Sequence, residues 1–221
     1  MLTYITPFAL YLIFSQLLAK APQNLYPLLY SGVVLLTGLT TFYLLRKKNI
    51  IPIHTNIWAG VLFGVIGIIA WILICGLQLE QSLAEFLPGW LQPEDRVAFN
   101  PFVAINDPLQ QWGFIGVRLL GLAVLVPVIE EIFWRGFLMR WIIDPDWENQ
   151  ALGRFTLSSF LWITLLFTLA HPEWFAAAVY CMLINGLMYW KKDLWNCVVA
   201  HATSNLLLGA YVLYAGAWEL W

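Results

Sequence analysis

The chain has 221 residues, of which 61% are hydrophobic and 11% are charged, and its formal net charge is −2. Soluble domains carry about 25% charged residues, so 11 basic and 13 acidic side chains are too few to cover a globule of this size in water. This composition excludes a soluble cytosolic enzyme, a disordered chain and a secreted disulfide scaffold. Since no basic block is present to collect phosphates, we expect no nucleic-acid partner. We therefore expect the protein to lie in a lipid bilayer.

Seven apolar segments have lengths typical of membrane-spanning helices, which need about 20 residues to cross about 30 Å of hydrocarbon. They are 4–19, 25–45, 57–79, 109–143, 155–170, 174–190 and 195–214. The first and the fifth are short, and the fourth gives two spans if it breaks at Pro127. The predicted fold is therefore an all-α, polytopic transmembrane helix bundle of seven spans, or of eight if the fourth segment divides.

The chain divides into two parts at residue 108. Residues 1–108 comprise three N-terminal transmembrane helices and a polar, proline-containing loop, 80–107, which we expect outside the cytoplasm. Residues 109–221 hold the remaining spans and every polar pattern described below, so we assign the catalytic transmembrane core to them.

Basic residues gather in the loops that alternate onto one end of the predicted bundle. These residues are Arg46, Lys47, Lys48, Arg140, Arg154, Lys191 and Lys192. Because loops rich in Lys and Arg stay in the cytoplasm, the N-terminus is predicted to be cytoplasmic. The protein is then a multi-pass protein of the cytoplasmic (inner) membrane. The first segment lacks a basic leader and a cleavage site, so we expect it to be retained as a helix.

A small set of polar side chains lies inside the predicted spans. Each ionised group near the bilayer centre costs at least about 2.5–3.5 kcal/mol, so such residues usually face a protein interior and function there. Glu131 and Arg135 are four residues apart and can pair on one helical face, whereas Glu130 points about 100° away from Glu131. Pro127 removes a helical hydrogen bond from the carbonyl of Ala123 one turn earlier.

Two further patterns contain histidine. His171 stands four residues after Phe167 and directly before Pro172, which ends regular helix, and His201 shares a helical face with Asn205. Counted at 1.5 Å per residue from the cytoplasmic ends of their helices, Glu130 and these three polar side chains lie at depths of roughly 9–24 Å, close enough to meet at or on the cytoplasmic side of the midplane. The sequence therefore predicts a single shared site.

The motifs Glu-Glu-x-x-x-Arg (130–135), Phe-x-x-x-His (167–171) and His-x-x-x-Asn (201–205) occur in this order on successive spans. In this the chain resembles the type II CAAX prenyl endopeptidase and bacteriocin-processing (CPBP, Abi) family of intramembrane proteases. The surrounding sequence is most similar to its CAAX protease-related branch, which accompanies PEP-CTERM/exosortase sorting systems. The resemblance covers residues 109–214.

The resemblance implies a glutamic-type intramembrane protease without a cofactor or metal. In this family's chemistry, Glu130 and His171 bind and deprotonate a water molecule, and His201 and Asn205 form the oxyanion hole. Glu131 and Arg135 orient and charge-balance the first carboxylate. The expected substrate is a protein or peptide at the membrane, either membrane-associated or bearing a C-terminal signal, and the branch suggests a link to an exosortase-type sorting system.

Two alternatives remain open from the sequence. Glu130, His171 and His201 form a two-histidine, one-carboxylate set of the kind that holds zinc, which would make the protein a membrane metalloprotease. Alternatively, the polar cluster serves a non-catalytic membrane scaffold or immunity protein. The cysteines Cys75, Cys181 and Cys197 are odd in number and lie in apolar stretches, so we interpret them as small buried hydrophobic residues.

Overall fold

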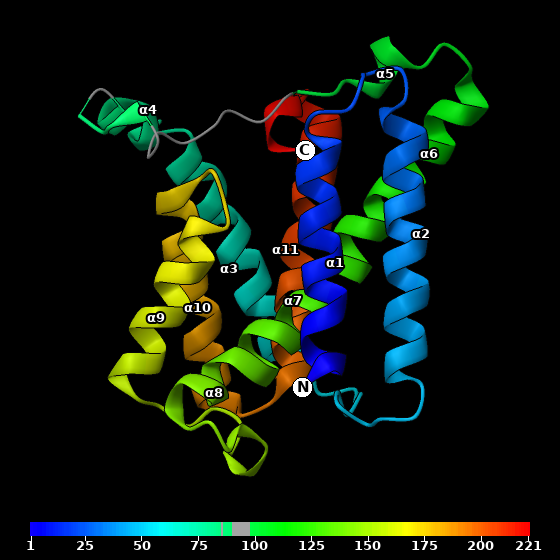
Figure 1. Ribbon diagram of the computed structural model, residues 1–221. Coiled ribbons are helices and arrows are strands. Elements are labelled where there is room, and N and C mark those ends of the chain that lie inside the picture. The colour runs from blue at the N-terminus through cyan, green and yellow to red at the C-terminus, as the bar shows by residue number, and fades with distance from the viewer. Residues whose placement is uncertain (85, 90–97) are drawn as a thin grey trace.

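The architecture is a bundle of helices, shown in Figure 1 as a computed structural model that describes residues 1–84, 86–89 and 98–221. The helices are α1 (Leu2–Leu18), α2 (Tyr26–Leu45), α3 (Trp58–Cys75), α4 (Leu79–Ala84), α5 (Pro101–Ala104), α6 (Pro108–Leu120), α7 (Val126–Glu131), α8 (Met139–Ile143), α9 (Leu157–Leu169), α10 (Trp174–Lys191) and α11 (Leu194–Ala215). Two π-helical turns, Gly121–Leu125 and Ile132–Leu138, join α6 to α7 and α7 to α8, and 3₁₀ turns occur at Trp147–Asn149 and Trp218–Leu220. No strand occurs among the described residues. The predicted all-α class is confirmed.

Each predicted apolar segment coincides with a helix to within a few residues. Within the described part of the chain, four helices are long and apolar enough to cross a membrane: Tyr26–Leu45, Trp58–Cys75, Pro108–Ile143 and Leu194–Ala215. The helices Leu2–Leu18 and Leu157–Leu169 are apolar but shorter. The predicted polar loop contains the short helices α4 and α5, and its residues 85 and 90–97 lie outside the described residues.

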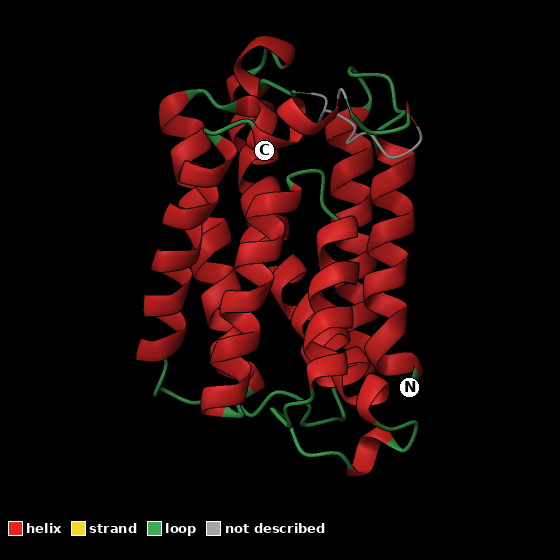
Figure 2. Cartoon of the chain, turned by 90° about the vertical axis from the view of Figure 1, so that its left-hand side faces the viewer, coloured by secondary structure: helices red, strands yellow, loops and turns green. Residues whose placement is uncertain are grey.

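The connections between the long helices lie at two opposite ends of the bundle. Figure 1 shows the N-terminus at the same end as the connections α2–α3, α8–α9 and α10–α11, and Figure 2 also shows the two termini at opposite ends. The loops that carry the basic residues therefore lie at one end of the bundle, as predicted. The assignment of this end to the cytoplasm stays a prediction.

The segment from α6 to α8 is one continuous helix of 36 residues, Pro108–Ile143. At 1.5 Å per residue it extends about 54 Å, which exceeds the hydrocarbon thickness of about 30 Å. Figure 1 shows how this length is accommodated: the segment runs obliquely across the bundle, from α6 beside α2 to α8 beside the start of α9. The helix continues through Pro127, so the fourth segment does not divide there, and the number of spans stays a prediction.

Helix α3 packs closely against α11 because glycines face it. A Cβ atom added to Gly60 would lie 2.7 Å from the carbonyl oxygen of Asn196, and one added to Gly64 would lie 2.6 Å from that of Ala200. The side chain of Asn196 also accepts a hydrogen bond from the backbone N–H of Gly60, at 2.9 Å, in the first turn of α3. This contact fixes the half of α11 that carries His201.

Candidate active site

The centre of the polar cluster is the carboxylate of Glu131, which is fully buried. Its Oε1 accepts a hydrogen bond from Nη1 of Arg135 at 3.0 Å and lies 2.9 Å from Nδ1 of His201. The predicted pairing of Glu131 with Arg135 is therefore confirmed. The third partner comes from α11, so Glu131 joins the long helix to the helix that carries the third motif.

Arg135 is fully buried and is held by groups that the sequence patterns did not single out. Its Nε donates to Oδ1 of Asn185 at 3.1 Å, and its Nη2 lies 3.4 Å from Sγ of Cys181. Both residues are on α10. The amide of Asn185 also donates to the hydroxyl of Thr164 on α9, at 3.5 Å. An asparagine within an apolar span was a usable signal for Asn185, because intramembrane polar residues rarely lack a partner.

Glu130 lies in α7 and is 9% exposed. Its Oε2 is buried and has no hydrogen-bond partner among the described residues. The carboxylate interacts electrostatically with His201, Glu131 and Arg135, and the side chain of Trp134, one turn later, is a hydrogen-bond donor to it. Because a buried carboxylate oxygen without a partner is costly, Glu130 is placed to receive a hydrogen bond from a water molecule or another small ligand.

His171 lies just beyond the end of α9, where Pro172 terminates the helical run as predicted. Nδ1 of His171 is 2.8 Å from the carbonyl oxygen of Phe167, and the two rings stack with centroids 4.4 Å apart. Nδ1 donates in this contact, since a carbonyl only accepts. In the neutral ring Nε2 is then the basic nitrogen. The Phe-x-x-x-His spacing thus fixes both the ring position and the tautomer of the histidine.

Aromatic rings lie between His171 and the other site residues. Phe167 lies beneath the guanidinium of Arg135, with the carbon Cζ 5.2 Å from the ring centroid. Tyr180 lies 6.4 Å from Phe167 and 5.7 Å from His201, measured between ring centroids. His171 is thus linked to His201 through the rings of Phe167 and Tyr180, and Glu130 interacts electrostatically with His201.

Asn205 faces the long helix, as His201 does. Its Nδ2 donates to the carbonyl oxygen of Leu122 at 2.8 Å. Leu122 lies in the π-helical turn Gly121–Leu125. The third motif therefore contacts the long helix at two levels, through His201 to Glu131 and through Asn205 to the backbone near Pro127.

The zinc alternative requires three ligands close enough to share one ion. Among the described residues, no group of three His, Cys, Asp or Glu side chains is arranged in this way. Glu130, His171 and His201 thus do not form a ready metal site. Cys181 and Cys197 are buried and unpaired in any disulfide, and Cys75 is partly buried.

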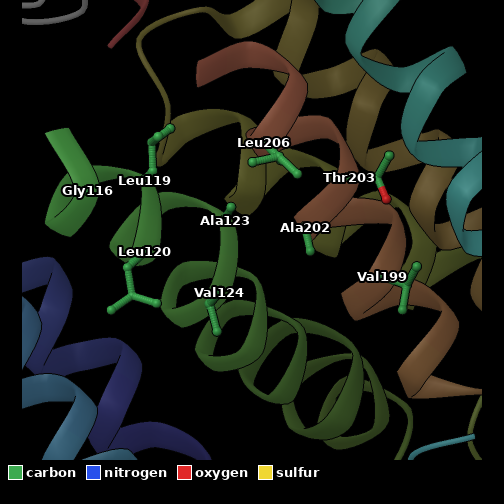
Figure 3. A pocket seen from close by; sticks show the side chains of 9 residues that line it. All are labelled: Gly116, Leu119, Leu120, Ala123, Val124, Val199, Ala202, Thr203 and Leu206. Atoms are coloured by element: carbon green, nitrogen blue, oxygen red, sulfur yellow. The ribbon is translucent and has the colours of Figure 1, made fainter. Parts of the chain in front are cut away.

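An apolar groove lies beside Asn205, between the long helix and α11. It has a volume of about 510 Å³ and is lined by Gly116, Leu119, Leu120, Ala123, Val124, Val199, Ala202, Thr203 and Leu206. Figure 3 shows these residues on the two neighbouring helices, with Ala123, Ala202 and Leu206 lying between them. Leu120, Val124 and Leu206 are each more than half exposed, so the groove opens at the outer surface of the bundle.

The comparison with protein families bears directly on this site. Residues 112–207 match the family model described as type II CAAX prenyl endopeptidase Rce1-like. The resemblance to the type II CAAX prenyl endopeptidases is confirmed. The Rce1-like segment contains all three motifs and lies within the predicted core, 109–221. It supports a CAAX-type protease at the membrane that acts on a peptide substrate. The PEP-CTERM-associated branch stays a prediction. No curated protein and no solved structure matched the chain.

Proposed function

We propose that this protein is an intramembrane endopeptidase that hydrolyses a peptide bond with a water molecule activated by Glu130. The observation that carries the proposal is the buried carboxylate of Glu130, whose Oε2 has no partner among the described residues, beside the Glu131–Arg135–His201 cluster. Peptide hydrolysis needs a base for water and donors for the carbonyl oxygen that becomes negative. The three motifs supply both kinds of group.

Glu130 and His171 act on the water. The carboxylate takes a proton while the water oxygen bonds to the carbonyl carbon of the peptide. The same proton then passes to the nitrogen of the departing amine as the C–N bond breaks. Nε2 of His171, the basic nitrogen when Nδ1 donates to Phe167, accepts a second hydrogen bond from the water and orients it.

His201 and Asn205 stabilise the negative oxygen. Because Nδ1 of His201 contacts Glu131, the carboxylate orients the ring, and Nε2 donates to the oxyanion when both ring nitrogens carry hydrogen. Asn205 has two N–H donors, of which the bond to Leu122 uses one.

The substrate is proposed to be a membrane-associated protein or one with a C-terminal signal, in line with the CAAX-type family match. The apolar groove beside Asn205 supports this class, because its lining suits an apolar chain segment and it opens at the outer surface of the bundle. A role in processing the cargo of an exosortase-type sorting system is a further part of the proposal, resting on the branch resemblance alone.

The test is the isosteric variant Glu130→Gln, compared with Glu148→Gln, which changes an exposed glutamate outside the cluster. Cells carrying wild type or either variant are compared by N-terminal labelling of their membrane and secreted proteomes. We expect an uncut precursor with Glu130→Gln only, since loss of a general base lowers rates by about 10²–10⁴-fold. Identical proteomes for all three, with equal protein levels, would contradict the proposal.

Two controls separate the alternatives. Stoichiometric zinc in the purified protein, together with cleavage that a strong chelator abolishes, would favour the metalloprotease. Failure of Glu130→Gln to fold, with no uncut precursor in the cells that carry it, would favour the non-catalytic scaffold or immunity protein.

A further inference from the structure

The backbone around Pro127 has an unusual hydrogen-bond register. The N–H of Val126 donates to the carbonyl of Gly121, five residues earlier, as in a π-helix. In the same register, the backbone nitrogen of the next residue, Pro127, would donate to the carbonyl oxygen of Leu122. Proline has no N–H, so this hydrogen bond is missing. In the α-helical register, the proline would instead withhold a bond from Ala123, as the sequence suggested. Because of the π-helical turn, the carbonyl without a backbone donor is that of Leu122 rather than that of Ala123.

The carbonyl that loses its helical donor is the one that Asn205 uses. Nδ2 of Asn205 is 2.8 Å from the oxygen of Leu122, although 83 residues separate the two in the chain. A backbone carbonyl oxygen has two lone pairs, and without a backbone N–H both of those on Leu122 are open to the amide of Asn205. The missing N–H of Pro127 thus leaves an acceptor that fixes the rotamer of Asn205.

We propose that Pro127 is a positioning residue: by withholding an N–H from Leu122, it holds the amide of Asn205 in place beside the catalytic cluster. The role in cleavage rests on the proposed function, whereas the coupling between the two residues does not. An amide held in this way keeps its second N–H in a fixed direction, which is what stabilisation of a developing oxyanion requires.

The test uses Pro127→Ala, which returns an N–H to the helix. Removing a proline from a helix interior favours helix formation, so this variant is expected to fold with an unchanged or higher Tm. We expect cleavage, read from accumulation of the uncut precursor, to fall at least 10-fold, about the loss for one hydrogen bond to a charged group. Pro7→Ala is the matched control, because Pro7 lies inside α1, and we expect it to leave cleavage unchanged.

A double-mutant cycle on stability tests the coupling without any substrate. In wild type, Asn205→Ala removes the bond to Leu122 and should lower the Tm in detergent by about 2–4 °C. In the Pro127→Ala background the same substitution should produce a smaller shift, because the new backbone N–H then also serves the carbonyl of Leu122. Placing the hydroxy-acid analogue of alanine at position 127, which again lacks an N–H, should restore both the shift and cleavage.

The outcomes are separable. Equal Tm shifts in both backgrounds, or full cleavage by Pro127→Ala, would overturn the positioning role of Pro127 while leaving Glu130 as the base. A coupled Tm shift with no effect of Glu130→Gln on the proteome would support the contact and contradict the proposed protease.

Discussion

Oε1 of Glu131 and Nδ1 of His201 lie 2.9 Å apart, although 70 positions separate the two residues in the chain. The same oxygen accepts from Arg135 at 3.0 Å, so one carboxylate oxygen serves two cationic or polar partners from two helices. A carboxylate shared in this way fixes the histidine ring and the packing of α11 on the long helix at the same time. Substitutions in the cluster therefore need to separate catalytic from structural effects.

Arg135 offers the clearest separation of the two effects. Arg135→Leu leaves Glu131 buried without its cation, and we expect a loss of stability of about 3–5 kcal/mol. The double variant Glu131→Leu/Arg135→Leu replaces the whole ion pair with apolar side chains and should regain most of that loss, yet it should not cleave. Thermal unfolding and monodispersity in detergent measure the first effect, and precursor accumulation measures the second. A stable Arg135→Leu protein would show that the pair does not support the fold.

Asn185 is predicted to position Arg135 without touching substrate. Asn185→Leu removes the acceptor for the buried Nε of Arg135, which should cost about 1–3 kcal/mol and reduce cleavage. Asn185→Asp keeps an acceptor but adds a charge that competes with Glu131 for the guanidinium. We therefore expect Asn185→Asp to be more stable than Asn185→Leu, but to cleave more slowly than wild type. Asn149→Leu, at an exposed site, is the control, and equal behaviour of all three would argue against the role.

Gly64 tests the close approach of α3 and α11. A Cβ atom at this position would lie 2.6 Å from the carbonyl oxygen of Ala200 and 2.7 Å from Cβ of Thr203, so the helices must separate to admit it. We expect Gly64→Ala to lower the free energy of unfolding by about 1–3 kcal/mol. Gly32→Ala on α2, where the added atom has no neighbour within 4 Å, should be neutral or slightly stabilising. Thermal unfolding in one detergent compares them directly.

Asp193 gives a prediction for pH. Partial burial acts to raise the pKa of Asp193, but hydrogen bonds from Asn196, His54 and backbone N–H groups outweigh burial and hold the pKa below its ordinary value. A carboxyl group with a lowered folded pKa stabilises the protein fully above its ordinary pKa, about 4, and loses this effect as the pH falls through the lower folded value.

Asp193→Ala removes this carboxylate from the N-cap of α11 and should cost about 1 kcal/mol near neutral pH. The difference in Tm between wild type and Asp193→Ala should stay constant above about pH 5 and shrink below about pH 4. Measuring both proteins across this range checks the sign. A difference that grows towards low pH would contradict the assignment of a stabilising carboxylate.

The sequence by itself determined the helical segments, the gathering of the basic loops at one end and the pairing of Glu131 with Arg135. These features depend on local quantities, namely the length of apolar runs, the alternation of spans and the i,i+4 geometry of one helix. The confirmed family resemblance likewise rests on short motifs. Local pattern is sufficient for such features because neighbours along a helix are neighbours in space.

Only the tertiary structure decided which partners these side chains found on other helices. The contact of His201 with Glu131 rather than Glu130, and the place of Asn185 beside Arg135, depend on how helices rotate against one another. The bond from Asn205 to Leu122 further required the π-helical turn before Pro127, which no sequence pattern indicated. Such contacts depend on tertiary packing, because the rotation of each helix about its axis is determined by all the helices that pack against it.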